Sequence, residues 1–165
     1  MARLLMLFEA HSGRSNKPVA GVTKLAKLDF LLRYPNCLER ALIAKDKPTE
    51  QAHIQEFERT TIESKMVRFR YGPWDHRYRR GIALLVGKGL LRAGVEGRTV
   101  KLWLTDAGHD VAKALGTSKD LEDLSVRASL VARTFGSMSG SGLKDFVYAT
   151  FPEITNMRWG DPITI

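Results

Sequence analysis

The sequence has a single cysteine, Cys37, among its 165 residues. One thiol allows no disulfide within the chain and no cysteine-rich metal site. Disulfides form and persist in oxidising compartments, whereas a reducing cytoplasm keeps thiols free. We therefore expect the protein to be cytoplasmic.

Long hydrophobic runs are also absent. The apolar run Leu4–Phe8 is too short to cross a bilayer or to form the hydrophobic region of a secretory signal. Because residues 2–10 carry little polar surface, we expect an apolar helix there, buried between other elements or in a subunit interface. No membrane contact is expected.

The spacings that metal and phosphate sites require are missing as well. Gly87-Lys88-Gly89 lacks the preceding strand of a phosphate-binding loop. The acidic residues form no spaced cluster of the kind found in nucleases. The histidines show no metal-ligand spacing, and they stand at His11, His53, His76 and His109. We therefore expect neither a metal nor a cofactor.

One neighbouring pair, Asp75-His76, invites a catalytic interpretation. No serine or cysteine motif completes a nucleophilic set around it. An aspartate in this position is more typical of a helix start, where its carboxylate accepts a hydrogen bond from a backbone amide. We therefore predict that the protein is not an enzyme.

The charge of the chain is concentrated in one segment, residues 65–101. This segment carries ten basic residues and two acidic ones, and the remainder carries 16 of each sign, so the segment accounts for the whole net charge of +8. Such a concentrated basic patch favours an anionic partner, nucleic acid above all. The basic residues are Lys65, Arg68, Arg70, Arg77, Arg79, Arg80, Lys88, Arg92, Arg98 and Lys101.

The pattern of the same segment predicts ordered elements. Val67, Phe69 and Tyr71 alternate with polar residues, which indicates a short strand with these three on one face. After Gly72-Pro73 we expect a helix from Asp75 to about Gly89. Two strands over about residues 90–104 should follow as a β-hairpin, and a helix over residues 107–115 should come next.

Upstream, residues 23–45 predict two helices joined at Tyr34-Pro35, because a residue before proline is disfavoured in the α conformation. This pair resembles the opening of a helix-turn-helix domain, and it fits a plain corner between two helices equally well. Residues 50–60 predict an exposed helix with a thin apolar face.

Downstream, a helix over residues 120–135 has an apolar seam that would serve for packing on the domain or on a partner. We expect a flexible glycine- and serine-rich hinge at residues 135–142 and a last amphipathic helix ending at Pro152. The tail containing Trp159 should dock on its own domain or on another subunit.

The order of helix, hairpin and helix predicts a winged helix-turn-helix domain, mainly α with a small β-wing and extra N- and C-terminal helices. The phrases GLLR (residues 89–92) and LTDAG (residues 104–108) resemble those of MarR- and PadR-type winged helices. We expect a winged-helix domain over residues 1–116, with the wing at about 90–104, and a helical extension over residues 117–165.

In such a domain the central helix enters the DNA major groove and the wing touches the flanking backbone. An acidic protein partner would suit the same basic face. Tyr71, Trp74 and Tyr78 are core or interface residues in our interpretation, with base stacking as the alternative. The candidate DNA- or partner-binding residues are Arg68, Arg70, Arg77, Arg79, Arg80, Lys88, Arg98 and Lys101.

Three phrases together carry a family resemblance: TKLAKLDFLLRYPNCLERAL (residues 23–42), ESKMVRFRYGPWDHRY (63–78) and GLKDFVYATFPE (142–153). This set resembles the small middle component of bacterial ABC-three-component defence systems, the group that includes Lamassu. YGP followed by a helix also shows a more distant similarity to the Panacea antitoxin domain.

The resemblance implies a winged-helix accessory subunit without catalytic residues of its own. Its partners would be an SMC/Rad50-like ABC ATPase and an effector, commonly a nuclease, in an antiviral or anti-plasmid complex. Under this resemblance the basic stretch would either grip double-stranded DNA or dock on acidic surfaces of the ATPase. The alternative from the residues themselves is a stand-alone winged-helix transcription regulator.

Overall fold

The computed structural model describes residues 1–13, 16–59 and 65–164, and it is mainly helical with small antiparallel sheets. No helix in these ranges is long and apolar enough to span a membrane. The helices are α1 (Ala2–Ser12), α2 (Val22–Arg33), α3 (Pro35–Ile43), α4 (Tyr78–Gly87), α5 (Asp106–Gly116), α6 (Glu122–Phe135), α7 (Gly140–Thr150) and α8 (Pro152–Asn156). The strands are β1 (Val19–Ala20), β2 (Val67–Phe69), β3 (Gly72–Trp74), β4 (Leu91–Glu96) and β5 (Thr99–Leu104).

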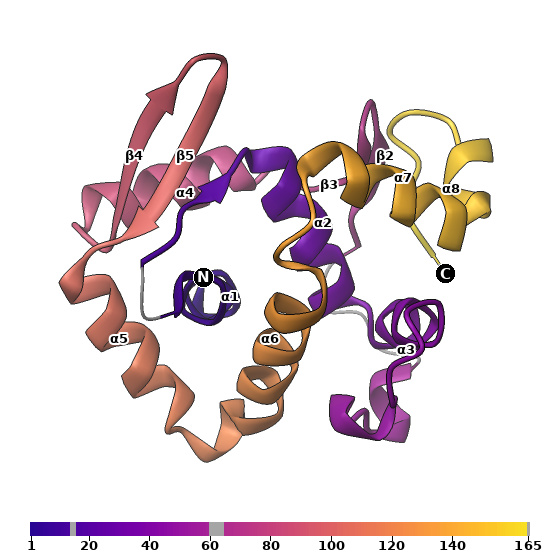
Figure 1. Ribbon diagram of the computed structural model, residues 1–165, viewed down its shortest axis with the longest axis horizontal. Coiled ribbons are helices and arrows are strands. Elements are labelled where there is room, and N and C mark those ends of the chain that lie inside the picture. The colour runs from indigo at the N-terminus through magenta and orange to yellow at the C-terminus, as the bar shows by residue number, and fades with distance from the viewer. Residues whose placement is uncertain (14–15, 60–64, 165) are drawn as a thin grey trace.

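Helix α1 is the centre of the molecule. Its residues Leu4–Phe8 are all buried, so the helix is apolar around its whole circumference, as the sequence predicts. It is seen end-on in Figure 1, with α5, α6 and β1 around it. The other elements therefore pack their apolar faces on a shared central helix.

Two antiparallel sheets lie on this helical core. Strand β5 is the middle of one sheet and pairs with β4 on one side and with β1 on the other, where Val19 faces Leu102. The other sheet is the β2–β3 hairpin. The expected hairpin at about residues 90–104 is confirmed as β4–β5, which projects from the body of the molecule (Figure 1).

The LTDAG phrase has a structural explanation at the start of α5. The Thr105 side chain accepts a hydrogen bond from the Gly108 amide and donates one to the Gly89 carbonyl. A Cβ atom on Gly108 would stand 2.0 Å from the Leu90 carbonyl oxygen. The glycine thus lets α5 approach the backbone that connects α4 to β4.

The corner at Tyr34 is confirmed, because α2 ends at Arg33 and α3 begins at Pro35. Tyr34 is itself buried and joins distant segments. Its hydroxyl accepts a hydrogen bond from the Met66 amide (2.6 Å) and donates one to the Ile163 carbonyl (3.3 Å). The corner therefore anchors both the start of β2 and the C-terminal tail.

The predicted helix over residues 50–60 is wrong for the part that the structure describes. Only two 3-10 turns form there, η2 (Glu50–Ala52) and η3 (Glu56–Arg59), and Thr60 lies outside the described residues. The segment has few apolar side chains to bury, and a helix without a packed face is marginal in water. Side-chain contacts, such as the ion pair of Arg59 with Glu39, attach it to α3 instead.

The hinge expected at residues 135–142 is replaced by two helix ends. Helix α6 runs to Phe135, and α7 already begins at Gly140, where the Ser139 side chain caps it by accepting a hydrogen bond from the Gly142 amide. The buried Lys24 ammonium holds the end of α6 by donating to the Gly136 carbonyl at 2.7 Å. The apolar seam of α6 packs on α1 and α2 of the same chain.

The expected domain boundary at residues 116 and 117 coincides with the end of α5, and the short turn η4 (Lys119–Leu121) follows it. Buried residues on both sides of this position belong to one apolar cluster. Val131 and Val147, for example, share it with Leu7 and Phe30. The C-terminal helices therefore contribute to the same core as α1 and α2.

A buried ion-pair network fixes α1, α2 and α4 to one another. The Asp29 carboxylate is fully buried and accepts hydrogen bonds from Arg3 (2.6 Å), Arg33 (2.7 Å) and the Tyr78 hydroxyl (2.6 Å). Arg33 also donates to Asp75 at 2.8 Å. Each carboxylate thus meets at least two donors, which a buried charge needs to be tolerated.

The network lowers the pKa of both aspartates. Burial alone would raise the pKa of Asp29, but the charges of Arg3 and Arg33 outweigh it and hold that pKa below its ordinary value. At Asp75 burial again opposes ionisation, and the hydrogen bonds from Arg77 and Arg33 outweigh it and lower the pKa. Both side chains are therefore ionised at neutral pH.

We expect the substitution Asp29→Asn to lower the free energy of unfolding by about 3–5 kcal/mol, because it removes the buried carboxylate charge that pairs with both Arg3 and the buried Arg33. Chemical denaturation measures this change. Asp145→Asn is the matched control on the surface, where an exposed ion pair contributes about 0–1 kcal/mol. Equal, small effects of both substitutions would contradict the role given to the network.

The network also predicts a pH dependence. Since the pKa of each aspartate is lower in the folded than in the unfolded state, its stabilisation is present above about pH 4 and is lost as the pH falls further. The free energy of unfolding should therefore decrease less steeply with falling pH in Asp29→Asn than in the unsubstituted protein.

We expect Gly108→Ala to destabilise the fold by several kcal/mol, roughly the upper range for single substitutions, because the new methyl group meets backbone at Leu90. Gly87→Ala is the matched control, since nothing lies within 4 Å of a Cβ atom there. Thermal unfolding compares the two. A Gly108→Ala protein as stable as Gly87→Ala would show that the close approach is unimportant.

Candidate nucleic-acid interface

Helix α4 presents one face to the core and a wide face to solvent. Tyr78 and Leu85 are buried on the inner face, and Ile82 packs beside them. The expected start at Asp75 is too early, because the helix begins at Tyr78. The Asp75 carboxylate does accept a hydrogen bond from the Arg77 amide (2.9 Å), as a helix start predicts, and it also belongs to the buried network. The exposed residues of the helix and its end are Arg79, Arg80, Ala83, Leu84, Val86, Gly87 and Lys88.

The exposed face of α4 combines cations with small side chains. At 100° per residue, Arg80, Ala83 and Gly87 lie along the middle of this face, and Arg79 stands to one side. Alanine and glycine add little height above the helix backbone. The geometry thus allows a partner to approach the helix closely while Arg79 and Arg80 reach its anionic groups.

The β4–β5 hairpin places further cations beside α4. Its register pairs Glu96 with Thr99, so Gly97 and Arg98 form a two-residue turn at the tip. Gly97 has φ +59°, which glycine adopts without steric cost in the first position of a type II′ turn. Arg98 is therefore exposed at the tip.

One hairpin cation was missing from the predicted set. Arg92 is exposed on β4, and its guanidinium lies 4.8 Å from the centre of the Trp103 ring on β5. The ring also covers Gly94, where a Cβ atom would come within 3.1 Å of it. The signal was present in the sequence, because Arg92 lies within the basic segment 65–101 and in a predicted strand of the hairpin.

The eight predicted binding residues separate into three groups in the structure. Arg79, Arg80, Lys88 and Arg98 are exposed, and none forms an ion pair with another described residue. Arg77 and Lys101 are engaged with acidic partners, Asp75 and Glu96. Arg70 and Arg68 belong to the other hairpin, β2–β3. The structure therefore leaves four of the eight as exposed cations, three on α4 and its end and one at the tip of the β4–β5 hairpin, and we call this set the exposed cationic face.

Arg68 is the clearest departure from expectation. It is buried, its Nε atom donates to the Ile154 carbonyl at 2.9 Å, and its guanidinium lies over the Tyr148 ring. The alternation of β2 is confirmed, but its inner face carries Arg68 and its outer face carries Phe69, which is exposed. Arg68 therefore holds the C-terminal segment rather than facing an external partner.

The aromatic residues for which base stacking is the alternative, Tyr71, Trp74 and Tyr78, have different environments. Tyr78 is buried against Asp29, in agreement with a core role, and burial raises the pKa of its hydroxyl well above the ordinary value. Trp74 is half-buried and packs on the core, with its ring 5.4 Å from that of Tyr78. Tyr71, by contrast, is exposed on the β2–β3 turn.

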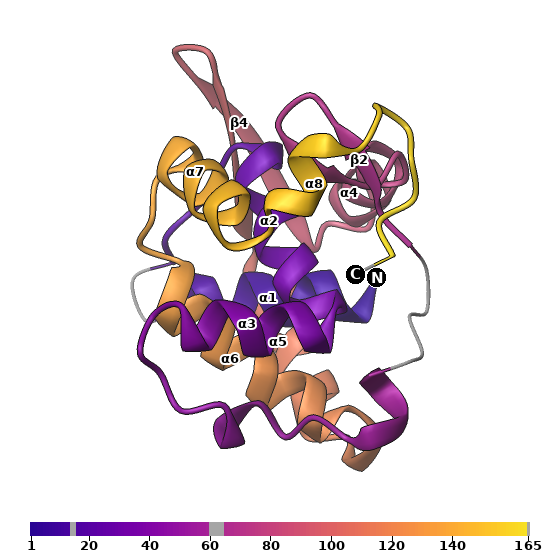
Figure 2. The same ribbon diagram turned by 90° about the vertical axis from the view of Figure 1, so that its right-hand side faces the viewer.

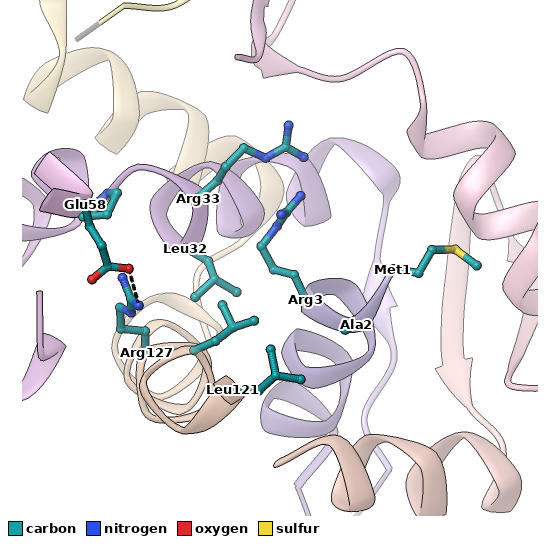
Figure 3. A pocket seen from close by; sticks show the side chains of 10 residues that line it. Met1, Ala2, Arg3, Leu32, Arg33, Glu58, Leu121 and Arg127 are labelled. Atoms are coloured by element: carbon teal, nitrogen blue, oxygen red, sulfur yellow. Dashed lines mark hydrogen bonds and ion pairs between the residues drawn. The ribbon is translucent and has the colours of Figure 1, made fainter. Parts of the chain in front are cut away.

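A pocket of about 310 Å³ lies between α1, α2 and α6. Figure 3 shows its apolar part, formed by Leu32 and Leu121, and the ion pair of Arg127 with Glu58 at one side. Arg3 and Arg33 also border it, and both are engaged in the Asp29 network. The charged groups around this pocket therefore serve internal ion pairs, and the exposed cationic face lies elsewhere, on α4 and the hairpin.

Within residues 1–13, 16–59 and 65–164, no three histidine, cysteine or acidic side chains lie close enough together to hold a metal ion. The single thiol, Cys37, is buried, and burial raises its pKa to about 12, so it stays protonated at neutral pH. No protein-family model, curated protein or solved structure matches the chain. The exposed cationic face is thus the strongest candidate for a functional site.

We expect the triple substitution Arg79→Glu, Arg80→Glu and Lys88→Glu to weaken binding to a double-stranded DNA probe at least tenfold. Each change removes a cation and adds a negative charge close to the phosphates. Binding by the unsubstituted protein should fall steeply as salt rises from 50 to 200 mM, a range suited to phosphate contacts. Fluorescence anisotropy measures both effects.

The matched control reverses two exposed lysines on another surface, Lys113→Glu and Lys119→Glu on α5 and η4. Arg77 is left unchanged, because its pairing with Asp75 ties it to the buried network. If the triple variant and the control bind DNA equally well, α4 is not a DNA-binding face.

Proposed function

We propose that the protein is a non-enzymatic winged-helix accessory subunit of an SMC/Rad50-like ABC ATPase defence complex, and that it bridges the ATPase and an effector. The resemblance of the three sequence phrases to Lamassu-type middle components motivates this proposal. The observation that carries it is the exposed cationic face of α4 beside the β4–β5 hairpin. An anionic partner would bind this face.

The order and pairing of the elements support the winged-helix part of the proposal. The first helix α1 is followed by β1 and α2, then by α4 and the β4–β5 hairpin, and β1 pairs with β5. Winged-helix domains have this order, with the last helix before the hairpin as the DNA-reading helix. In this chain residues 34–77 form an insertion between the second and third helices of the domain.

The structural roles of the YGPWDHRY phrase support a positioning function for this insertion. Gly72 has φ +112° in the β2–β3 hairpin, a conformation that other residues rarely adopt. Asp75 pairs with Arg33, and Tyr78 donates to Asp29. The phrase therefore builds the turn and the anchor from which α4 begins. A helix that docks on a specific partner needs its first turn to be held in a fixed position.

A bridging role requires a second surface away from α4. Two exposed apolar side chains offer one, Ile43 at the end of α3 (65% exposed) and Phe57 in η3 (69% exposed). Figures 1 and 2 place α3 and the β4–β5 hairpin on opposite sides of the molecule. We assign the cationic face to DNA or to an acidic surface of the ATPase, and the α3–η3 side to the effector.

The alternative function is a stand-alone winged-helix transcription regulator. The small residues Ala83 and Gly87 on the outer face of α4 favour it, because a helix that enters the major groove must approach base edges closely. Such regulators bind as dimers to two half-sites about one helical turn apart. The two functions therefore differ in the partner that they require.

Co-purification separates these functions. If the chain is an accessory subunit, it should purify as a stable complex when it is co-expressed with the products of its neighbouring genes, including an ABC ATPase with a long coiled-coil insert. Ile43→Glu and Phe57→Glu should release the effector but retain the ATPase. A chain that purifies alone, as a homodimer with sequence-specific binding to a palindrome, would replace the proposal by the regulator.

A further inference from the structure

An exposed aromatic surface lies on the β2–β3 hairpin and the adjacent tail. Its members are Phe69 (40% exposed), Tyr71 (48% exposed), Trp159 (64% exposed), the half-buried Trp74 and the exposed His76. Large aromatic side chains with this much exposure are unusual when they cluster, and such clusters mark interaction sites. The exposed rings take no part in the buried ion-pair network, and the proposed contacts with the ATPase and the effector do not involve them.

Four of these rings, those of Phe69, Trp74, His76 and Trp159, form a connected array centred on Phe69. The centre of the Phe69 ring lies 6.1 Å from those of Trp74 and Trp159 and 6.0 Å from that of His76. The Phe69 and Trp74 planes are close to parallel, at 29°. Such an array presents ring faces and edges to solvent in fixed relative positions, which suits the stacking of planar groups.

Backbone hydrogen bonds hold the tail that carries Trp159 in place. The Arg68 amide donates to the Asp161 carbonyl (2.8 Å), the Gly160 amide donates to the Arg68 carbonyl (2.7 Å), and the Ile163 amide donates to the Met66 carbonyl (2.8 Å). The tail thus extends the β2–β3 hairpin by a third segment, and both views show them side by side (Figures 1 and 2). Trp159 is exposed although its backbone is fixed.

Cations surround this surface. Lys65, Arg70 and Arg158 are exposed on the segments that carry the aromatic rings, and the Arg77 side chain is 66% exposed beside His76. The acidic residues of these described segments have other contacts, since Asp75 pairs with Arg33 and Asp161 accepts a hydrogen bond from the Arg158 amide. The surface is therefore apolar in its centre and positive at its rim.

From these observations we propose that the aromatic surface binds single-stranded nucleic acid, with unpaired bases stacked on Phe69 and Trp159 and phosphates near the surrounding cations. Unpaired bases offer planar faces of any sequence, and each is linked to an anionic phosphate. An aliphatic or acidic protein segment would match only half of this surface. The inference goes beyond the proposed function, because it needs neither the ATPase nor the effector.

The aromatic surface adjoins the start of α4. The Trp74 ring contacts Tyr78 at the first turn of α4, and Arg77 lies between the two surfaces in the chain. We expect a strand that leaves a duplex at the first turn of α4 to pass over the aromatic rings. The protein should then bind a duplex with a single-stranded overhang more tightly than a blunt duplex of the same length.

The test measures binding of a fluorescent 20-nucleotide oligothymidine by anisotropy, together with quenching of tryptophan fluorescence. Trp159→Leu and Phe69→Leu should each weaken binding about tenfold, since they remove a stacking ring but keep apolar bulk. Trp159→Phe should keep most of the affinity because a ring is retained. Phe57→Leu, which changes an exposed phenylalanine in η3, is the matched control and should have no effect.

Two outcomes would overturn the inference. One is an unsubstituted protein that neither binds the oligothymidine nor shows quenching. The other is equal binding by Trp159→Leu, Phe69→Leu and Phe57→Leu, with all three shown to be folded by circular dichroism. Failure of the proposed function is recognised separately, because it appears in co-purification and in blunt-duplex binding by the α4 variants. Loss of the complex in Trp159→Leu without oligothymidine binding would assign the surface to a protein instead.

Discussion

The arrangement of the helices depends on the buried carboxylate of Asp29. It receives Arg3 from α1, Arg33 from its own helix α2, and the Tyr78 hydroxyl from α4. A fully buried charge is tolerated only when its partners are all in place, so the three helices have one favourable arrangement with respect to it. Asp75 extends the same constraint to the connection before α4.

This constraint explains how α4 can be both fixed and exposed. Its first turn is attached through Tyr78, and its middle is attached through Leu85, which leaves most of its circumference in solvent. Cations on such a surface cost little, because water solvates them fully. The fold therefore supports a concentrated positive face without burying any of those charges.

The segment between α2 and α4 adds a second exposed surface to the same anchor. The hydroxyl of Tyr34 fixes both Met66 and Ile163, and Arg68 fixes the C-terminal segment through Ile154. The tail is thereby placed beside β2, with the Trp159 ring next to Phe69. The aromatic surface and the cationic helix are separate in chemistry, yet they share one support and lie next to each other.

The sequence by itself determined the elements whose signals are local. The apolar run of α1, the Tyr34-Pro35 corner, the β4–β5 hairpin and the helix after it each depend on neighbouring residues, and each was predicted correctly. The concentration of charge on residues 65–101 was equally visible, as were four exposed cations of the candidate interface.

Tertiary structure alone decided which of those polar side chains face outward. Arg68 is buried because a carbonyl and a ring about 80 residues away complete its environment, and no local pattern reports such partners. The same holds for the pairing of Asp75 with Arg33, because a helix-start pattern predicts only the hydrogen bond that Asp75 accepts from the Arg77 amide. Local sequence thus indicated most of the elements and the total charge, whereas long-range pairing selected the charges and rings that remain available to a partner.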